Sequence, residues 1–506
     1  MKKQFSIVGF CVFFALNLFS QENSTAYRTE LFGSAATGEN TPFWMLYRNW
    51  GMVPLEAGNF YVRGGVFHAG QINNDWSYKL GIDIAASSPH SFGTVWMQQI
   101  YGELNRKTLR LTIGSKEDYT SLLDEYLSSG DFSLSNNARP IPEIKGSIPD
   151  FILVPRTKGN MYIKGDFAIG KYMDGNWQED KALPYNQPYT KDILSHHKSI
   201  YFRFGNINKQ HKLQFTAGMD HQAQWGGKLY IYRYVEETGQ LDYVMHKQPQ
   251  GLDDLFRVMI AKEGSPGSSG ADVAYVAGSH VGSYLLRFDY KLKNSAQISL
   301  YRHIFYEDGS GMTLENYRDG ILGVQYKSAE KKLLSNIVFE YIYTKHQTGP
   351  IHFNLEMDDA HDHLRHNGNA NDDYYNNCDY VQGRSYYGRT MGTPLFLSCE
   401  YNADGRLEFK SNRIISYHLG MEGYFTSNLK YRLTATTGQT WGRYYVPFRS
   451  EKTGFTSNLD LIYNYPRIKG LNIKLSTGFN TGEFFGGDTF GGGITLTKTG
   501  ILKSPH

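Results

Sequence analysis

Apolar and polar residues alternate along much of the chain, in short segments that are separated by turn residues. Residues 431–436, Tyr-Arg-Leu-Thr-Ala-Thr, change face at every position. Alternation with a period of two is the pattern of a half-buried β-strand. It predicts about sixteen strands, and two weaker candidates at residues 27–35 and 44–53 bring the number to about eighteen. An even number is expected of a bacterial single-chain barrel.

The predicted connections alternate between short and long from residue 199 onward. Short turns lie near Asn208, Asn294, Lys331, Thr426 and Lys469, whereas the longer connections cover residues 219–282, 307–319, 346–412 and 442–456. Transmembrane barrels have short periplasmic turns and long extracellular loops, and a β-sandwich or a propeller gives no reason for this alternation. The sequence therefore predicts an all-β fold, a transmembrane antiparallel β-barrel in which residues 219–282 and 346–412 are long extracellular loops.

One connection does not follow this alternation. Residues 115–158 contain four prolines, and residues 119–128 have the pattern of a short helix. Counting strands backward from residue 199 places this segment on the periplasmic side. A periplasmic segment of this length predicts short helices or a plug at that end of the barrel. No linker divides the chain convincingly, so residues 21–506 are predicted to form one outer-membrane barrel domain.

The composition agrees with a barrel. The chain has 53 Gly, 38 Tyr and 30 Phe, 20% charged residues and a mean hydropathy of −0.47. Glycine and tyrosine favour strands and turns, and a polar average fits a barrel whose alternate residues face a wet lumen. A secreted β-rich enzyme or lectin has a similar composition. The formal charge of only +3 argues against a nucleic-acid partner, whose binding needs many cationic contacts.

Residues 1–20 have the features of a secretory signal peptide. Lys2 and Lys3 precede an apolar stretch, and polar sequence follows from Ser20 onward. No apolar run after the N-terminus approaches the ~18–20 residues that a membrane-spanning helix needs. A helical membrane protein is therefore excluded, and we expect export to the cell outer membrane.

Residues 358–366 form the densest group of potential metal ligands, with Asp358, Asp359, His361 and His363 as candidates. Carboxylates and imidazoles suit divalent cations. The segment contains neither an EF-hand loop nor a His-Glu-x-x-His helix. A solvated loop is the simpler interpretation, so neither a metal nor another cofactor is predicted.

Catalysis is not predicted either. Cys399 has no histidine at a spacing typical of a cysteine nucleophile, and together with Cys378 it fits a disulfide as well as two thiols. Paired carboxylates, as used for glycoside hydrolysis, occur at 253–254, 358–359 and 372–373, but nothing singles out a general acid. A surface glycan hydrolase stays an alternative function. An outer-membrane porin or solute channel is the stronger alternative.

The predicted extracellular loops carry aromatic residues interleaved with arginines. Sugar rings stack on aromatic planes, and acidic sugars pair with guanidinium groups. The same residue types form the aromatic girdle of a barrel, which fits Trp441 and Tyr444 best. For Tyr374 and Tyr375, deep inside a long loop, binding and loop packing are equally good interpretations. The candidate polysaccharide-binding residues are Trp225, Tyr374, Tyr375, Arg384, Tyr386, Tyr387 and Arg389.

A set of short segments is more specific than any single motif. In chain order it includes residues 96–104 (WMQQIYGEL), 224–227 (QWGG), 277–283 (AGSHVGS), 344–350 (TKHQTGP) and 388–394 (GRTMGTP). This ordered set resembles the Wzi capsule assembly family of outer-membrane proteins, in the form found in Bacteroidetes-type bacteria. One departure from many outer-membrane barrels is the end of the chain, Pro505-His506, which has no terminal aromatic residue.

The resemblance implies an outer-membrane barrel of about eighteen strands with helices at its periplasmic end. It also implies a lectin-like role without catalysis or a cofactor: binding capsular polysaccharide or exopolysaccharide and helping to retain or assemble it at the cell surface. The implied partners are this polysaccharide and outer-membrane lipid. The polysaccharide export machinery is a further candidate partner.

Overall fold

The computed structural model describes residues 23–89, 95–205, 212–236, 238–265, 267–268, 276–293, 296–307, 309–347, 352–353, 368–369 and 372–503. The predicted signal peptide lies outside the described residues. The metal candidates Asp358, Asp359, His361 and His363 also lie outside them.

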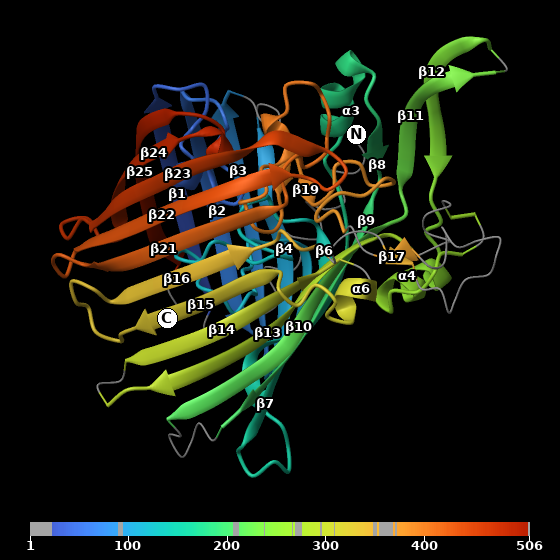
Figure 1. Ribbon diagram of the computed structural model, residues 1–506. Coiled ribbons are helices and arrows are strands. Elements are labelled where there is room, and N and C mark those ends of the chain that lie inside the picture. The colour runs from blue at the N-terminus through green and yellow to red at the C-terminus, as the bar shows by residue number, and fades with distance from the viewer. Residues whose placement is uncertain are drawn as a thin grey trace.

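Eighteen antiparallel strands form one closed barrel, as the sequence predicts. The sheet closes because β1 pairs with β2 on one side and with β25 on the other, and Figure 1 shows the strands wrapped into a single wall. In chain order the barrel strands are β1 (Ser24–Ala36), β2 (Asn59–Gln71), β3 (Trp76–Ser88), β4 (Trp96–Arg106), β5 (Leu109–Ser115), β6 (Glu143–Leu153), β7 (Met161–Lys171), β9 (Leu194–Phe204), β10 (Leu213–Trp225), β13 (Ser279–Lys291), β14 (Gln297–Tyr306), β15 (Gly320–Lys327), β16 (Asn336–Tyr343), β21 (Ile414–Tyr424), β22 (Leu429–Gly442), β23 (Pro447–Asn464), β24 (Leu471–Thr481) and β25 (Thr489–Lys503).

The two faces of the wall differ in polarity. On β13, Leu286 and Phe288 are 41% and 46% exposed, whereas Arg287 and Asp289 between and beside them are buried. Exposed apolar side chains recur on other strands, among them Phe60, Val62, Ile82, Ile84, Ile298, Leu300, Leu322, Val324, Phe339, Leu475 and Leu496. A closed barrel with an apolar outer face and a polar lumen spans a membrane with every ladder hydrogen bond satisfied. The chain is therefore an outer-membrane protein.

The two ends of the barrel differ in the length of their connections. Thr25 at the start of β1 pairs with Lys503 at the end of β25, so the first and last strands place their free ends together. Short turns gather at this end, which is the periplasmic end of a bacterial barrel. The long connections gather at the opposite end, which we call the outer end; they are residues 37–58, 116–142, 172–193, 226–278, 307–319 and 344–413.

One of the eighteen strands is not the predicted one. The candidate at residues 44–53 is wrong, because these residues form the short helix α2 (Phe43–Leu46) and turns. The missing strand is β6, in which Pro149 lies at a shift of register between Ile148 and Ile152. Proline cannot donate to a ladder and is tolerated at such irregularities, so Pro149 hides a strand from a search for regular alternation.

The additional strand changes the place of the plug segment. Because β6 occupies part of residues 115–158, the remaining connection, residues 116–142, starts and ends at the outer end of the barrel. The predicted helix at residues 119–128 is wrong, since the backbone there forms turns. The tip nevertheless reaches far into the lumen: Gln325, near the periplasmic end of β15, donates a hydrogen bond to Asp124 (Nε2 to Oδ2, 3.0 Å).

Three segments enter the lumen and narrow it, and we call residues 37–58, 116–142 and 372–412 together the lumen plug. Their apolar side chains share one buried cluster with the inner face of the wall. The ring of Phe132 stacks on Phe305 of β14 with 4.1 Å between centroids. The indole of Trp44 donates a hydrogen bond to Thr436 on β22 (2.8 Å). The plug is therefore packed against more than one part of the wall.

The other elements are short. They are α3 (Trp177–Ala182), η1 (Leu183–Tyr185), β8 (Tyr189–Lys191), β11 (Lys228–Val235), β12 (Gln240–Lys247), α4 (Leu252–Met259), α6 (Gly309–Met312), β17 (His352–Phe353), β18 (Gly368–Asn369), β19 (Ser385–Tyr386), β20 (Arg389–Thr390), η3 (Cys399–Tyr401) and η4 (Glu483–Phe485). None of the helices in the described part of the chain has the length and apolar character needed to span a membrane.

Candidate functional site

A cavity of about 480 Å³ opens at the outer end of the barrel, and we call it the outer cavity. It forms where the connection 172–193, the plug segment 372–412 and the turn between β22 and β23 meet. Polar side chains make up most of its lining, which consists of Gln187, Pro188, Asp373, Asn376, Asn377, Cys378, Val381, Arg406, Leu407, Glu408, Arg443 and Tyr445.

Arg443 ties the sides of the outer cavity together. Its Nε donates to Asp373 Oδ2 (2.9 Å), and its Nη1 forms an ion pair with Glu408. The amides of Asn376 and Asn412 also donate to Asp373 Oδ1, at 3.0 and 2.6 Å. Burial lowers the pKa of Arg443, but Asp373 and Glu408 more than compensate and leave it raised. This guanidinium therefore has a structural role.

Arg406 and Tyr445 are the more accessible groups of the outer cavity. The Arg406 side chain is 53% exposed, and its ion pairs with Asp404 (3.7 Å) and Glu408 (3.3 Å) are solvated. Tyr445 is 60% exposed. An accessible guanidinium and an accessible aromatic ring are the groups that bind acidic sugars and sugar rings.

A second feature of the outer end is the hairpin of β11 and β12, which we call the tyrosine hairpin. Figure 1 shows it reaching away from the barrel. The ring of Tyr230 on β11 stacks on Tyr189 of β8, with 4.8 Å between centroids and 9° between planes. The hydroxyl of Tyr243 on β12 donates to the carbonyl of Gln187 (3.0 Å), which lines the outer cavity. Tyr234 is 60% exposed. The hairpin and the cavity thus form one outer surface.

Tyr374 and Tyr375 lie inside the lumen plug. They are 0% and 1% exposed. The Tyr374 hydroxyl donates to Asp319 Oδ2 (2.9 Å), and the Tyr375 hydroxyl donates to the carbonyl of Phe132. Burial raises the pKa of both phenols well above the usual value. Both residues have a packing role in this structure, and their role in sugar binding stays a prediction.

Arg384 and Arg389 fasten the same segment. Arg384 bonds to Gln222 on β10. Arg389 donates to the carbonyl of Val53 (2.9 Å) and pairs with Glu400 (3.1 Å). Both arginines are 1% exposed, so in this structure their contacts are with the protein itself.

Tyr386 and Tyr387 form a pair with 4.8 Å between ring centroids. The Tyr386 hydroxyl accepts a bond from the Met173 amide (3.3 Å), and the Tyr387 hydroxyl donates to the Met173 carbonyl (2.7 Å). Tyr387 is half-buried and lies 4.6 Å from the guanidinium of Arg139. Of the predicted binding residues, Tyr387 is the one with appreciable exposure.

Trp225 lies apart from these residues, at the outer end of β10. Its neighbour Gln224 donates to the carbonyl of Gly383 in the plug (2.9 Å), so Trp225 points to the other face of the wall. There it is buried in a cluster with Val258 of α4. The structure thus gathers the other predicted residues in the plug and separates Trp225 from them.

Some residues of the outer cavity escape sequence reasoning. Gln187 and Arg406 have no distinguishing motif, although residues 404–410, with alternating charges around Gly405, carry a weak signal. Cys378 lines the cavity and Cys399 is buried, and no disulfide joins them. Burial raises the pKa of the Cys399 thiol to about 12, which leaves it protonated.

Comparison with known proteins supports the fold. No protein-family model matches the chain, and no curated protein matches it in sequence. Among solved structures, the chain is similar to Wzi, an outer-membrane protein involved in group 1 capsule assembly in Escherichia coli, which is a carbohydrate-binding β-barrel. That match has 11% identity and a TM-score of 0.54, and covers 93% of this chain and 83% of Wzi.

Weaker matches include OpdO and OpdQ of Pseudomonas aeruginosa, each 10% identical, with TM-scores of 0.47 and 0.45. Each covers 95% of this chain and 98% of the other protein. At 11% identity the similarity to Wzi shows a shared barrel fold.

Proposed function

We propose that the chain belongs to the Wzi capsule assembly family and acts as a non-enzymatic outer-membrane lectin. It binds capsular polysaccharide or exopolysaccharide and helps to retain and assemble it at the cell surface. The observation that carries this proposal is the contrast between a lumen occupied by a packed plug and an outer surface with accessible aromatic and cationic groups. The fold shared with a carbohydrate-binding barrel supports it.

The outer surface suits a polymer better than a small solute. Arg406 offers a guanidinium to acidic sugars, and Tyr445 and Tyr234 offer exposed rings on which sugar faces stack. A long chain engages several such weak contacts at once, and linked contacts raise the total affinity without any single strong one. Outer-membrane lipid holds the barrel in place, and the polysaccharide export machinery is the candidate supplier of the polymer.

A channel is the less favoured function, because the three segments of the lumen plug pack against the wall from several sides. A hydrolase at the outer cavity is less favoured as well. Its acids Asp373 and Glu408 both contact Arg443. Glycoside hydrolysis needs two carboxyl groups that face the substrate, whereas both of these are engaged by the Arg443 guanidinium.

The test compares polysaccharide retention in cells that lack the gene with retention in the same cells carrying a plasmid copy of the wild type or of a variant. Cell-attached and released polymer are measured in the same culture. We expect attached polymer to fall and released polymer to rise in the deletion strain while their sum stays constant. The plasmid copy restores attachment, and Arg406→Ala combined with Tyr445→Ala restores it only in part.

Phe425→Ala is the matched control, because it removes an exposed ring (56%) at the periplasmic end of the same barrel. It should restore attachment fully. Unchanged attachment in the deletion strain contradicts the proposal. In that case, ion conductance of the purified protein in planar bilayers would indicate a channel, and new reducing ends on the polymer would indicate a hydrolase.

A further inference from the structure

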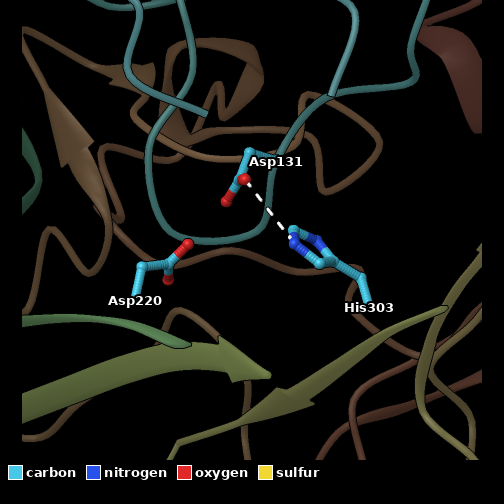
Figure 2. Close-up of side chains that lie close together, drawn as sticks. All are labelled: Asp131, Asp220 and His303. Atoms are coloured by element: carbon cyan, nitrogen blue, oxygen red, sulfur yellow. Dashed lines mark ion pairs between the residues drawn. The ribbon is translucent and has the colours of Figure 1, made fainter. Parts of the chain in front are cut away.

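Three buried side chains meet where the lumen plug touches the wall. Asp131 belongs to the plug connection 116–142, Asp220 to β10 and His303 to β14. Each has a potential ligand atom within 4.8 Å of those of the other two, and the side chains are 1%, 5% and 1% exposed. Figure 2 shows both carboxylates and the imidazole turned toward a common centre. Residues far apart in sequence thus converge at one point.

The two carboxylates have only neutral hydrogen-bond donors. Asp131 accepts from the Ser121 hydroxyl (2.5 Å) and the Ser133 amide (2.9 Å). Asp220 accepts from the Ser133 hydroxyl and from the hydroxyl of Tyr201 (3.2 Å). Within the described residues, neither acid forms an ion pair with a lysine or an arginine. Two neighbouring buried carboxylates without a countercharge are unfavourable unless a cation or a proton joins them.

The imidazole of His303 supplies a second, independent observation. Its Nδ1 is buried and has no hydrogen-bond partner among the described residues. Its Nε2 points at Asp131 Oδ2 from 3.9 Å, which is beyond hydrogen-bond range. A buried ring nitrogen normally has a partner, and a metal ion between the imidazole and the carboxylates would supply one to Nε2, the nitrogen that faces Asp131.

We propose that Asp131, Asp220 and His303 bind one divalent metal ion, and that this ion fastens the lumen plug to β10 and β14. A doubly charged ion balances the two carboxylates, and the neutral imidazole completes the set. The mixed nitrogen and oxygen donors favour a first-row ion such as Zn²⁺ over Ca²⁺, which prefers oxygen alone. Ligands of a tetrahedral zinc ion lie about 3.4 Å apart, so small side-chain shifts close the site.

The role that follows is structural and independent of polysaccharide binding. Asp131 reaches the site only when the plug is in the lumen, whereas Asp220 and His303 are part of the wall. Metal binding is therefore coupled to insertion of the plug. The site is also distant in sequence from the metal candidates at residues 358–363.

The test uses the full chain, refolded in detergent with Zn²⁺, Mn²⁺ and Ca²⁺ at equal concentration and then freed of unbound metal. Elemental analysis should give about one zinc per chain. Asp131→Asn and His303→Gln should each lower this ratio at least about tenfold. Replacement of Zn²⁺ by Co²⁺ should give visible absorption bands in the wild type that both variants lack.

His221→Gln is the matched control, because His221 is the neighbour of Asp220 on β10 and is also buried, but it bonds to His280 (2.9 Å) instead. It should keep the metal. Heat-dependent migration on gels reports whether each variant has folded. Asp131→Asn lies outside the strands, so it tests the site even if His303→Gln does not fold. Fewer than about 0.1 metal ions per refolded wild-type chain, or metal retained in both ligand variants, would overturn the proposal and leave a shared proton as the countercharge.

Discussion

The lumen plug and the tyrosine hairpin are both built from long connections at the outer end of the barrel, yet the plug lies in the lumen and the hairpin points away from the barrel. The plug connection 116–142 turns inward, where Glu340 of β16 accepts bonds from the hydroxyl of Ser128 (2.8 Å) and the amide of Ser129 (2.7 Å). The hairpin turns outward and leaves Tyr234 and Leu241 about 60% exposed. Connection length alone therefore does not decide where a loop lies.

The difference follows from how each segment satisfies its backbone. In the hairpin β11 pairs with β12 along its whole length and with β8 at its base, so its ladder is formed without a strand of the barrel wall. The plug connection has no such ladder, and side chains of the wall supply its partners. Only a barrel whose lumen is lined with polar groups can bury a loop of this kind.

Removal of the plug connection should have the largest effect. We expect replacement of residues 120–138 by a short Gly-Ser linker to raise the single-channel conductance in planar bilayers at least about tenfold, because polar lumen space becomes open to water. Deletion of residues 229–246 in the hairpin should leave the conductance unchanged. Equal conductance of both deletions would show that the other two plug segments are sufficient to close the lumen.

Loss of the Glu340 carboxylate, which β16 of the wall presents to the plug, should strongly destabilise the plug. Glu340→Ala leaves the Ser129 amide and the Tyr301 hydroxyl (2.5 Å from Oε1) buried without an acceptor. We expect a loss of about 4 kcal/mol in the free energy of plug unfolding, measured by protease cleavage at increasing urea concentration. Tyr234→Ala in the hairpin should change it by less than about 0.5 kcal/mol.

The stability of the plug, and not that of the hairpin, should depend on pH. Burial raises the pKa of Asp319 to about 6, although bonds from the Gln347 amide (2.6 Å) and Tyr374 (2.9 Å) lower it in part. The folded state therefore holds a proton that the unfolded state releases near pH 4. This proton stabilises the folded state fully below pH 4. The stabilisation is lost as the pH rises through 6, which lowers the free energy of unfolding by up to about 3 kcal/mol.

Urea titrations of plug cleavage between pH 4 and pH 7 measure this dependence. Asp319→Asn should make the curve less steep, because the asparagine side chain does not titrate in this range while other buried acids still do. A wild-type curve that is already flat would mean that Asp319 is ionised throughout. Hydrogen exchange of the hairpin amides, corrected for intrinsic rates, should show no matching change.

The sequence predicts the wall better than its contents. Alternation along strands such as β13 and β22 follows directly from the lipid on one side and the wet lumen on the other. It fails at β6, where Pro149 breaks the ladder, and at residues 44–53, whose apolar side chains pack in the lumen rather than face lipid. Neither segment can be assigned correctly without knowing which strands lie beside it.

The candidate binding site could not be predicted in the same way. Tyr374 and Arg384 have the chemistry of a sugar site, but whether a loop points inward or outward depends on contacts such as Asp319 and Gln222, which are distant in sequence. Arg406 and Tyr445 line one cavity only because two connections meet there. Composition identifies the residue types, and the fold decides which of them remain accessible.

The smallest expected effect is a loss of stability in the hairpin alone. It distinguishes local opening of the hairpin from unfolding of the barrel. Tyr230→Ala removes the stack on Tyr189 and should cost about 1 kcal/mol, seen as faster hydrogen exchange of the β11 and β12 amides. The barrel amides should be unaffected, because the hairpin pairs with β8 and not with a strand of the wall. Tyr375→Ala is the matching change in the plug and should cost about 3–5 kcal/mol, since it opens a cavity in a packed cluster. Equal losses for the two tyrosines would mean that the hairpin is as tightly coupled to the barrel as the plug is.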